Sequence, residues 1–204
     1  MIIPTTTLLQ EVQDYVEAFY HRFQRAELLY HNIHHTENVV RRSCEICDCY
    51  SLRETDRFIL LAAAWFHDTG QLFGSPVNHE ERSVIIMKDF MDDKIADETI
   101  IHAIEGCIIA TKLANDPHTF LEEIICDADT YNLGTTEFSR TDKLLKKEFE
   151  LRLNEEMVNW SELTLSFLET HTYFTPYCQS LLNNKKQKNK RLVESRLKLK
   201  RKRV

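Results

Sequence analysis

Apolar residues recur at helical spacing along most of this chain, and little interrupts the pattern. Only four glycines and four prolines occur among 204 residues, so few positions disfavour a helix. No segment shows the convincing apolar-polar alternation that a half-buried strand requires. We therefore predict an all-α fold, a single helical bundle. The predicted helices cover residues 8–28, 36–50, 55–68, 79–93, 97–112, 118–128, 136–155 and 158–170.

One predicted helix contains a continuous apolar run from Phe58 to Phe66, which is followed directly by His67 and Asp68. An ionisable pair at the inner end of a buried helix is costly unless something binds it, and a metal ion is one such partner. Histidine and aspartate are also ordinary residues near helix ends. Taken alone, the pair is equally consistent with two metal ligands and with a structural cap.

A second group of histidines lies in the segment YHNIHH, residues 30–35. His31 and His35 are four residues apart, so on one helical turn they would share a face and address one pocket. His34 lies off that face, and we interpret it as a surface or packing residue. Imidazole and carboxylate groups together suit a divalent ion and leave coordination positions for water, which hydrolysis requires.

Two carboxylates complete the set of candidate ligands. Asp127 and Asp129 lie in the segment CDADTYNLG, which begins at Cys126. Either one can join the histidines, and the other would then support the ligands by hydrogen bonding. The spacing alone does not decide between them.

Three motifs follow one another along the chain: Tyr-His-Asn-x-x-His, His-Asp and a late Asp. This ordered set resembles the motifs of the HD superfamily of metal-dependent phosphohydrolases. The first motif, Tyr30-His31-Asn32, resembles the cyclic-nucleotide phosphodiesterases within that superfamily. The resemblance covers roughly residues 28–140. It implies an all-α domain that binds a divalent metal ion (Mn, Fe, Mg, Ni or Zn) and hydrolyses phosphate esters.

The resemblance also implies roles for individual residues. Four of them are the implied metal ligands: His35, His67, Asp68 and Asp129. His31 matches the residue that protonates the leaving group, and a histidine, with an unperturbed pKa of about 6.5, can donate a proton at neutral pH. A supporting or helix-capping histidine is the alternative for His31. After His67-Asp68 the chain continues TGQ, residues 69–71, without the glutamate that serves as base in some HD nucleotidases. Water activation would then depend on the metal with Asp68 or Asp129.

Three further residues are weaker candidates for supporting the ligands or binding substrate. The segment NHEERS, residues 78–83, resembles a bacterial branch of HD phosphohydrolases, and there His79 would face the metal pocket while Arg82 could clamp a phosphate. Lys112 ends an Ala-Thr-Lys segment that resembles the same branch. An exposed helix start and a helix-dipole partner are the commoner explanations for Arg82 and Lys112. Cys107 stands where many two-metal members have a histidine, which leaves open whether one or two metals bind.

Charge is distributed unevenly along the chain. Residues 185–204 hold eleven Lys or Arg and one Glu, a net charge of +10, whereas residues 1–184 carry −16. We predict one domain, residues 1–184, followed by a basic tail, residues 185–204, that is helical or partly disordered. The tail has no aromatic residues for base stacking, so a nucleic-acid partner is not expected. The large apolar residues of 136–170 fit core packing, with a homodimer seam as the alternative.

We predict a cytoplasmic protein without a membrane partner, because no targeting segment is evident and the run 58–66 is far shorter than the roughly twenty residues that span a bilayer. The six cysteines fit reduced thiols, and Cys44, Cys47 and Cys49 lack the second pair that a zinc site needs.

The sequence thus predicts a metal-dependent phosphohydrolase, acting as a phosphodiesterase or a phosphomonoesterase on a small phosphorylated substrate such as a nucleotide or cyclic nucleotide. The alternative is a catalytically idle HD domain that senses a nucleotide or metal. An α-helical scaffold with structural histidines is a third hypothesis.

Overall fold

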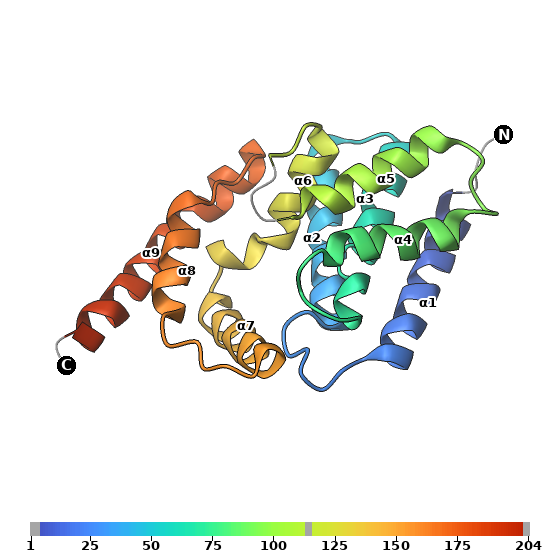
Figure 1. Ribbon diagram of the computed structural model, residues 1–204. Coiled ribbons are helices and arrows are strands. Elements are labelled where there is room, and N and C mark those ends of the chain that lie inside the picture. The colour runs from blue at the N-terminus through green and yellow to red at the C-terminus, as the bar shows by residue number, and fades with distance from the viewer. Residues whose placement is uncertain (1–4, 113–115, 202–204) are drawn as a thin grey trace. The chain divides into compact units, whose positions relative to one another are not determined.

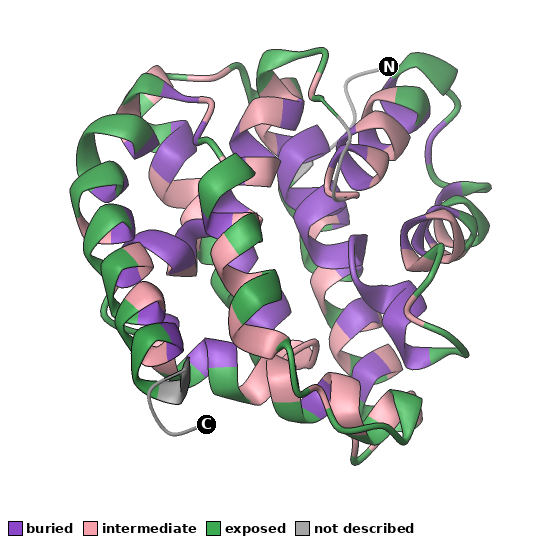
Figure 2. Ribbon diagram, turned by 60° about the vertical axis from the view of Figure 1, so that its left-hand side comes forward, coloured by how far each residue is buried: buried purple, intermediate pink, exposed green. Residues whose placement is uncertain are grey.

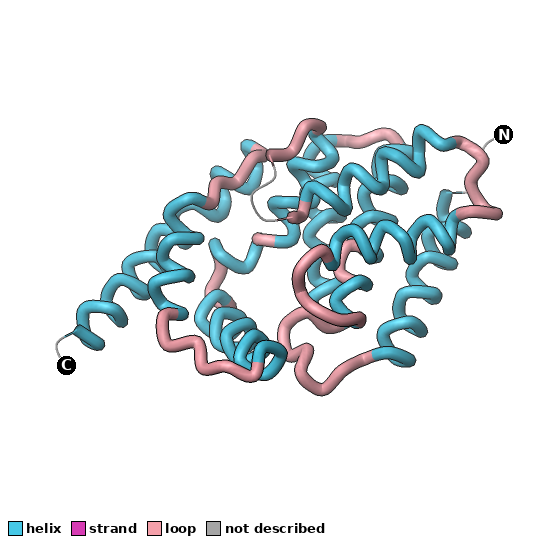
Figure 3. The backbone as a smooth tube through the Cα atoms, viewed as in Figure 1, coloured by secondary structure: helices cyan, strands magenta, loops and turns pink. Residues whose placement is uncertain are grey.

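The computed structural model describes residues 5–112 and 116–201, and these form helices joined by loops, without a strand (Figure 3). This confirms the predicted all-α class. The chain divides into two compact units, unit 1 (Met1–Asp129) and unit 2 (Thr130–Val204). All the candidate site residues belong to unit 1. Within the described residues, no helix is long and apolar enough to cross a membrane.

Unit 1 is organised around one buried helix (Figure 1). Its elements are α1 (Thr5–Phe23), α2 (Ile33–Tyr50), α3 (Glu54–Phe66), the 3-10 helix η1 (Thr69–Leu72), α4 (His79–Met91), α5 (Glu98–Ala110) and α6 (Phe120–Asp129). Helix α3 packs against α1, α2, α4, α5 and α6. Every residue from Phe58 to Phe66 is buried, and Figure 2 shows such buried stretches in purple. The His67-Asp68 pair therefore follows the central element of unit 1.

The first helix is shorter than predicted. Helical spacing extends through Leu28, but α1 ends at Phe23. Beyond it the backbone forms turns, in which the amide of Leu28 donates to the carbonyl of Arg25 at 3.1 Å. Leu28 is nonetheless buried. The apolar pattern indicates which side chains are buried. Here the side chain of Leu28 is buried by a turn and not by a helix.

Unit 2 contains the 3-10 helix η2 (Tyr131–Gly134), α7 (Phe138–Leu153), α8 (Trp160–Thr170) and α9 (Pro176–Arg201). Helix α9 packs against η2 and α8. A Cβ atom added at Gly134 would lie 2.5 Å from Cβ of Leu182, so only glycine permits this close approach of η2 to α9.

The segment predicted to be a basic tail lies in α9 as far as Arg201. Val193 and Leu197 are buried there, which gives this part of the helix a packed face. The predicted boundary at residue 184 falls inside the helix. The division into one domain and a tail stays a prediction, and residues 202–204 lie outside the described part of the chain.

Candidate metal centre

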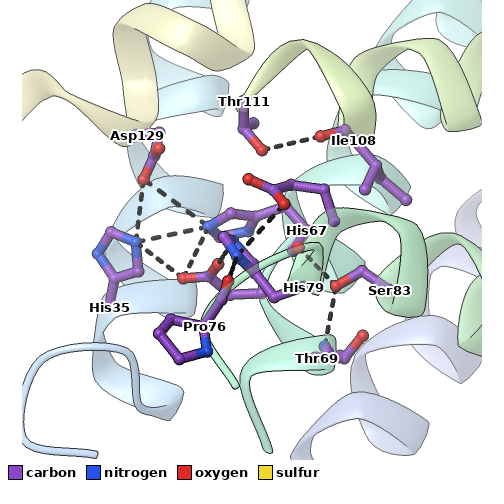
Figure 4. Close-up of polar contacts among 12 residues, drawn as sticks. His35, His67, Thr69, Pro76, His79, Ser83, Ile108, Thr111 and Asp129 are labelled. Carbon is purple, nitrogen blue, oxygen red and sulfur yellow. Dashed lines mark hydrogen bonds and ion pairs between the residues drawn. The ribbon is translucent and has the colours of Figure 1, made fainter. Parts of the chain in front are cut away.

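Four side chains converge in unit 1 from the start of α2, the end of α3 and the end of α6. Nε2 of His35 lies 3.0 Å from Oδ1 of Asp129, 3.4 Å from Oδ2 of Asp68 and 3.4 Å from Nε2 of His67. Nε2 of His67 lies 3.4 Å from Oδ2 of Asp68 and 3.8 Å from Oδ1 of Asp129. Figure 4 shows His35, His67 and Asp129 pointing toward one another.

These spacings fit a single metal ion. Ligand atoms at about 2.1 Å from a metal are about 3.4 Å apart in a tetrahedron and about 3.0 Å apart at adjacent corners of an octahedron. The ligand atoms of His35, His67 and Asp129 are 3.0–3.8 Å apart, and Oδ2 of Asp68 lies 3.4 Å from both imidazole nitrogens. Oδ2 of Asp68 is also buried and accepts no hydrogen bond from the described residues, which is costly for a carboxylate oxygen unless a cation binds it. The nitrogen and oxygen donors suit a divalent ion.

Backbone carbonyls orient two of the imidazoles. Nδ1 of His67 donates to the carbonyl of Ala64 at 2.8 Å, so its Nε2 faces the cluster and can be left without a proton. Nδ1 of His79 donates to the carbonyl of Pro76 at 2.9 Å, and its Nε2 lies 3.1 Å from Oδ1 of Asp68. His79 thus holds one oxygen of Asp68, while the other oxygen faces the remaining ligands.

The electrostatics of the cluster favour positive charge. Burial lowers the pKa of His67, but the negative charges of Asp68 and Asp129 outweigh this and bring that pKa to about 9. Burial raises the pKa of Asp68, yet His67 and His31 hold it well below its usual value. Burial raises the pKa of Asp129 as well, but the hydrogen bond to His35 and the charge of that histidine outweigh burial and lower this pKa below its usual value. A divalent cation would replace the imidazole protons in this negative potential.

His31 does not share a helical turn with His35, so the geometric argument from their spacing was wrong. Asn32 lies between them as the N-cap of α2, which begins at Ile33. Its side-chain oxygen accepts from the amide of His34 at 3.0 Å, and its side-chain nitrogen donates to the carbonyl of Leu29 at 3.0 Å. Asn is a preferred cap because it satisfies an otherwise unbonded amide of the first turn.

His31 nevertheless lies beside the cluster. The centroid of its ring is 5.8 Å from that of His35 and 6.5 Å from that of His79. His34 projects away, with its side chain 82% exposed and paired with Glu37. The loop before the cap, rather than a helix face, places His31 near the candidate ligands.

The two aspartates of α6 occupy different surroundings. Asp129 provides the oxygen that lies 3.0 Å from His35, and it belongs to the group of potential ligands formed with His35 and His67. Asp127 is fully buried and does not belong to that group. Of the two alternatives that the sequence left open, the geometry favours Asp129 as the ligand.

The two candidate phosphate contacts have partners within the chain. The guanidinium of Arg82 donates to the carbonyls of Gly70 at 3.1 Å, Val77 at 2.9 Å and Ser75. Nζ of Lys112 lies 2.6 Å from a carboxylate oxygen of Glu81. Arg82 therefore holds the loop between η1 and α4, and Lys112 tethers the end of α5 to α4.

Ser83 and Gly70 join α4 to the turn that carries His67 and Asp68, and reasoning from the sequence gave neither of them a role. The hydroxyl of Ser83 donates to the carbonyl of His67 at 2.6 Å and accepts from the amide of Gly70 at 2.9 Å. A Cβ atom at Gly70 would lie 2.0 Å from the carbonyl oxygen of His79. The sequence signals were an isolated glycine two residues after the His-Asp pair and, for Ser83, its place at the end of the NHEERS segment.

We expect Gly70→Ala to separate α4 from this turn. The added methyl group meets backbone, which cannot yield as a flexible side chain can, so we expect a loss of about 1–3 kcal/mol in the free energy of unfolding and weaker metal binding. Urea denaturation and metal titration would measure both. Gly106→Ala in α5 is the matched control, because its Cβ would meet only the carboxylate of Glu122, at 3.2 Å. Equal stability of the two variants would contradict the packing described for Gly70.

The cysteines do not form a metal site in residues 5–112 and 116–201, where no group of potential ligands contains one. All six are free thiols. Cys107, at the position where the resemblance would place a histidine, is buried, and burial raises its pKa to about 12. It packs as a small apolar residue.

The comparisons with known proteins give one match. Residues 32–133, half of the 204-residue chain, match the family model described as HD domain. The matched segment runs from the N-cap of α2 into η2, so it contains His35, His67, Asp68 and Asp129. No curated protein and no solved structure matches the chain.

Proposed function

This chain belongs to the HD-domain family, and on that premise we propose that it is a metal-dependent phosphohydrolase whose substrate is a nucleotide or cyclic nucleotide. HD-domain proteins typically bind divalent metals and hydrolyse phosphate esters. The observation that carries the proposal is the convergence of His35, His67 and Asp129, whose ligand atoms lie 3.0–3.8 Å apart. Oδ2 of Asp68 lies 3.4 Å from Nε2 of both histidines. The Tyr30-His31-Asn32 segment supports the preference for a nucleotide ester.

The proposed roles of the side chains follow from their positions. His35, His67, Asp68 and Asp129 would hold the divalent ion. When bound, the ion acts as a Lewis acid, which lowers the pKa of a coordinated water and polarises the phosphoryl oxygens of the substrate. His79 and Ser83 keep Asp68 and the His67 backbone in place through the contacts at 3.1 Å and 2.6 Å. His31 donates a proton to the departing oxygen.

Metal analysis and ester hydrolysis test this proposal. The purified protein is assayed with bis(p-nitrophenyl) phosphate and p-nitrophenyl phosphate, with manganese, after treatment with a chelator, and after manganese is restored. The double variant His67→Ala/Asp68→Ala is the matched blank. We expect turnover that disappears with the metal, returns with it, and is absent in the variant. The preferred ester distinguishes a diesterase from a monoesterase.

Two results would contradict the proposal. Bound metal without turnover on these esters or on a panel of nucleotides would favour a metal- or nucleotide-binding sensor. Absence of metal from both proteins, even with manganese supplied, would overturn the site assignment.

A further inference from the structure

Unit 2 contains a cavity of about 480 Å³ beside the junction of α8 and α9. Pockets for small ligands commonly measure about 300–1,000 Å³. The lining includes two lysines, one carboxylate and several neutral polar groups: Lys186, Lys190, Glu169, His171, Tyr173 and Asn183. The cavity thus combines a ligand-sized volume with two lysines. None of these residues belongs to the candidate metal centre.

Lys186 is a buried cation without an acidic partner. Its side chain and backbone are only 4% exposed. Its ammonium group donates to the carbonyl of His171, lies 3.1 Å from Nδ1 of the same histidine, and lies 5.5 Å from the ring centroid of Tyr173. In the described part of the chain, no carboxylate oxygen lies within 4.0 Å of Nζ of Lys186. Two of its three N–H groups have His171 as partner, and the third has no acceptor there.

The charge of Lys186 is therefore incompletely compensated. Burial, and then the charge of Lys190, lower the pKa of Lys186. Buried charges in proteins are normally paired with an opposite charge. Lys190, on the same face of α9, lies 3.1 Å from a carboxylate oxygen of Glu169, but that carboxylate does not reach Lys186.

A purely structural role explains part of this arrangement. His171 is the C-cap of α8, and a cation at a helix C-terminus stabilises the helix through its dipole. Capping accounts for the contact between Lys186 and the carbonyl of His171. It does not account for the cavity, for the second lysine, or for the third N–H group.

We propose that this cavity binds a small phosphate-class anion, either inorganic phosphate or the phosphate group of a small phosphomonoester. Lys186 supplies a charged donor from the buried side and Lys190 a second one nearer the solvent. An ammonium group binds phosphate as a point charge. Lys190 is already paired with Glu169, so Lys186 is the main source of uncompensated positive charge in the cavity.

Calorimetric titration tests the proposal in the His67→Ala/Asp68→Ala background, which removes the candidate metal centre as a competing phosphate site. Inorganic phosphate and glycerol 1-phosphate are titrated separately at constant ionic strength in chloride. The variants are Lys186→Met and, as the matched control, Lys188→Met, which changes an exposed lysine of the same helix. Lys190→Met provides a second variant that leaves the buried position intact, and circular dichroism verifies that each protein is folded.

We expect the background protein and the Lys188→Met variant to bind phosphate equally. Lys186→Met should weaken binding by about tenfold or more, as the loss of a charged hydrogen bond predicts, and Lys190→Met should weaken it as well. Tighter binding of glycerol 1-phosphate than of inorganic phosphate would identify a phosphomonoester as the ligand, and weaker binding would identify free phosphate. Absence of binding in the background protein, or unchanged binding in folded Lys186→Met and Lys190→Met, would overturn the proposal. Because the metal ligands are already replaced, neither result depends on the proposed hydrolase.

Discussion

Asp129→Asn should remove the bound metal, whereas Asp127→Asn should leave it bound. Oδ1 of Asp129 lies 3.0 Å from Nε2 of His35 and 3.8 Å from Nε2 of His67, so its replacement removes a charged candidate ligand from the cluster. Replacing a residue that supports a metal ligand typically lowers the affinity for the metal by about 10- to 100-fold. For Asp129→Asn we expect a loss of more than about 100-fold, with hydrolysis lost in parallel. Competition with a chromophoric chelator measures the affinity.

The pair of variants is informative because both positions lie in α6, two residues apart. Asp127 is fully buried, so Asp127→Asn should lower the thermal denaturation midpoint while the metal content per chain stays unchanged. The reverse pattern, with metal lost from Asp127→Asn and kept by Asp129→Asn, would show that the ligand assignment is wrong. Loss from both folded variants would mean that the two carboxylates act together.

The helices of unit 1 were predictable because their apolar faces are continuous. The spacing predicted a helix over residues 97–112, and α5 spans Glu98–Ala110. The errors occur where a side chain is buried without a helical backbone. Leu28 extends the apolar pattern beyond the end of α1. The helix predicted over residues 55–68 included the buried pair His67 and Asp68, although α3 ends at Phe66. Periodicity reports which side chains are buried and does not report where the backbone leaves the helix.

The candidate site was predictable only in part. Residues from α2, α3 and α6 meet through tertiary packing, which no local spacing encodes, so the ordered motifs and their resemblance to a family supplied that grouping. The geometric argument for His31 and His35 failed because Asn32 caps α2 between them. An asparagine before a run of helical periodicity is a recognisable cap signal, and it was the clue that the spacing argument missed.

The contacts that support the ligands were the least visible in the sequence. Ser83 acts through its hydrogen bond to the carbonyl of His67, and Gly70 through the absence of a side chain. For Arg82 the sequence offered a phosphate clamp and, as the commoner explanation, an exposed helix start, whereas its guanidinium donates to the backbone carbonyls of Gly70 and Val77. Every residue has a backbone carbonyl, so the sequence does not show which carbonyls accept hydrogen bonds from a side chain. It therefore cannot show that the guanidinium of Arg82 is already bound by them.

His31→Ala should reduce hydrolysis while the metal remains bound, and the size of the reduction should depend on the leaving group. His31 lies beside the cluster, with its ring centroid 5.8 Å from that of His35, and it is not in the group of potential ligands. A positioned general acid typically contributes about 100- to 10,000-fold. We expect a loss of that size for an ester with an alkoxide leaving group, which needs a proton to depart. The loss should be much smaller for a p-nitrophenyl ester, whose leaving group departs as a stable anion.

His34→Ala is the matched control for this experiment. It changes a histidine of the same segment whose side chain is 82% exposed and paired with Glu37, so both turnover and metal content should match the unmodified protein. Rates for a series of esters, plotted against the pKa of the leaving group, give a steeper dependence for His31→Ala if His31 is the acid. Equal losses across the series, with metal retained, would assign His31 to positioning of the substrate or of a ligand. Loss of the metal itself would place His31 among the groups that hold the ion.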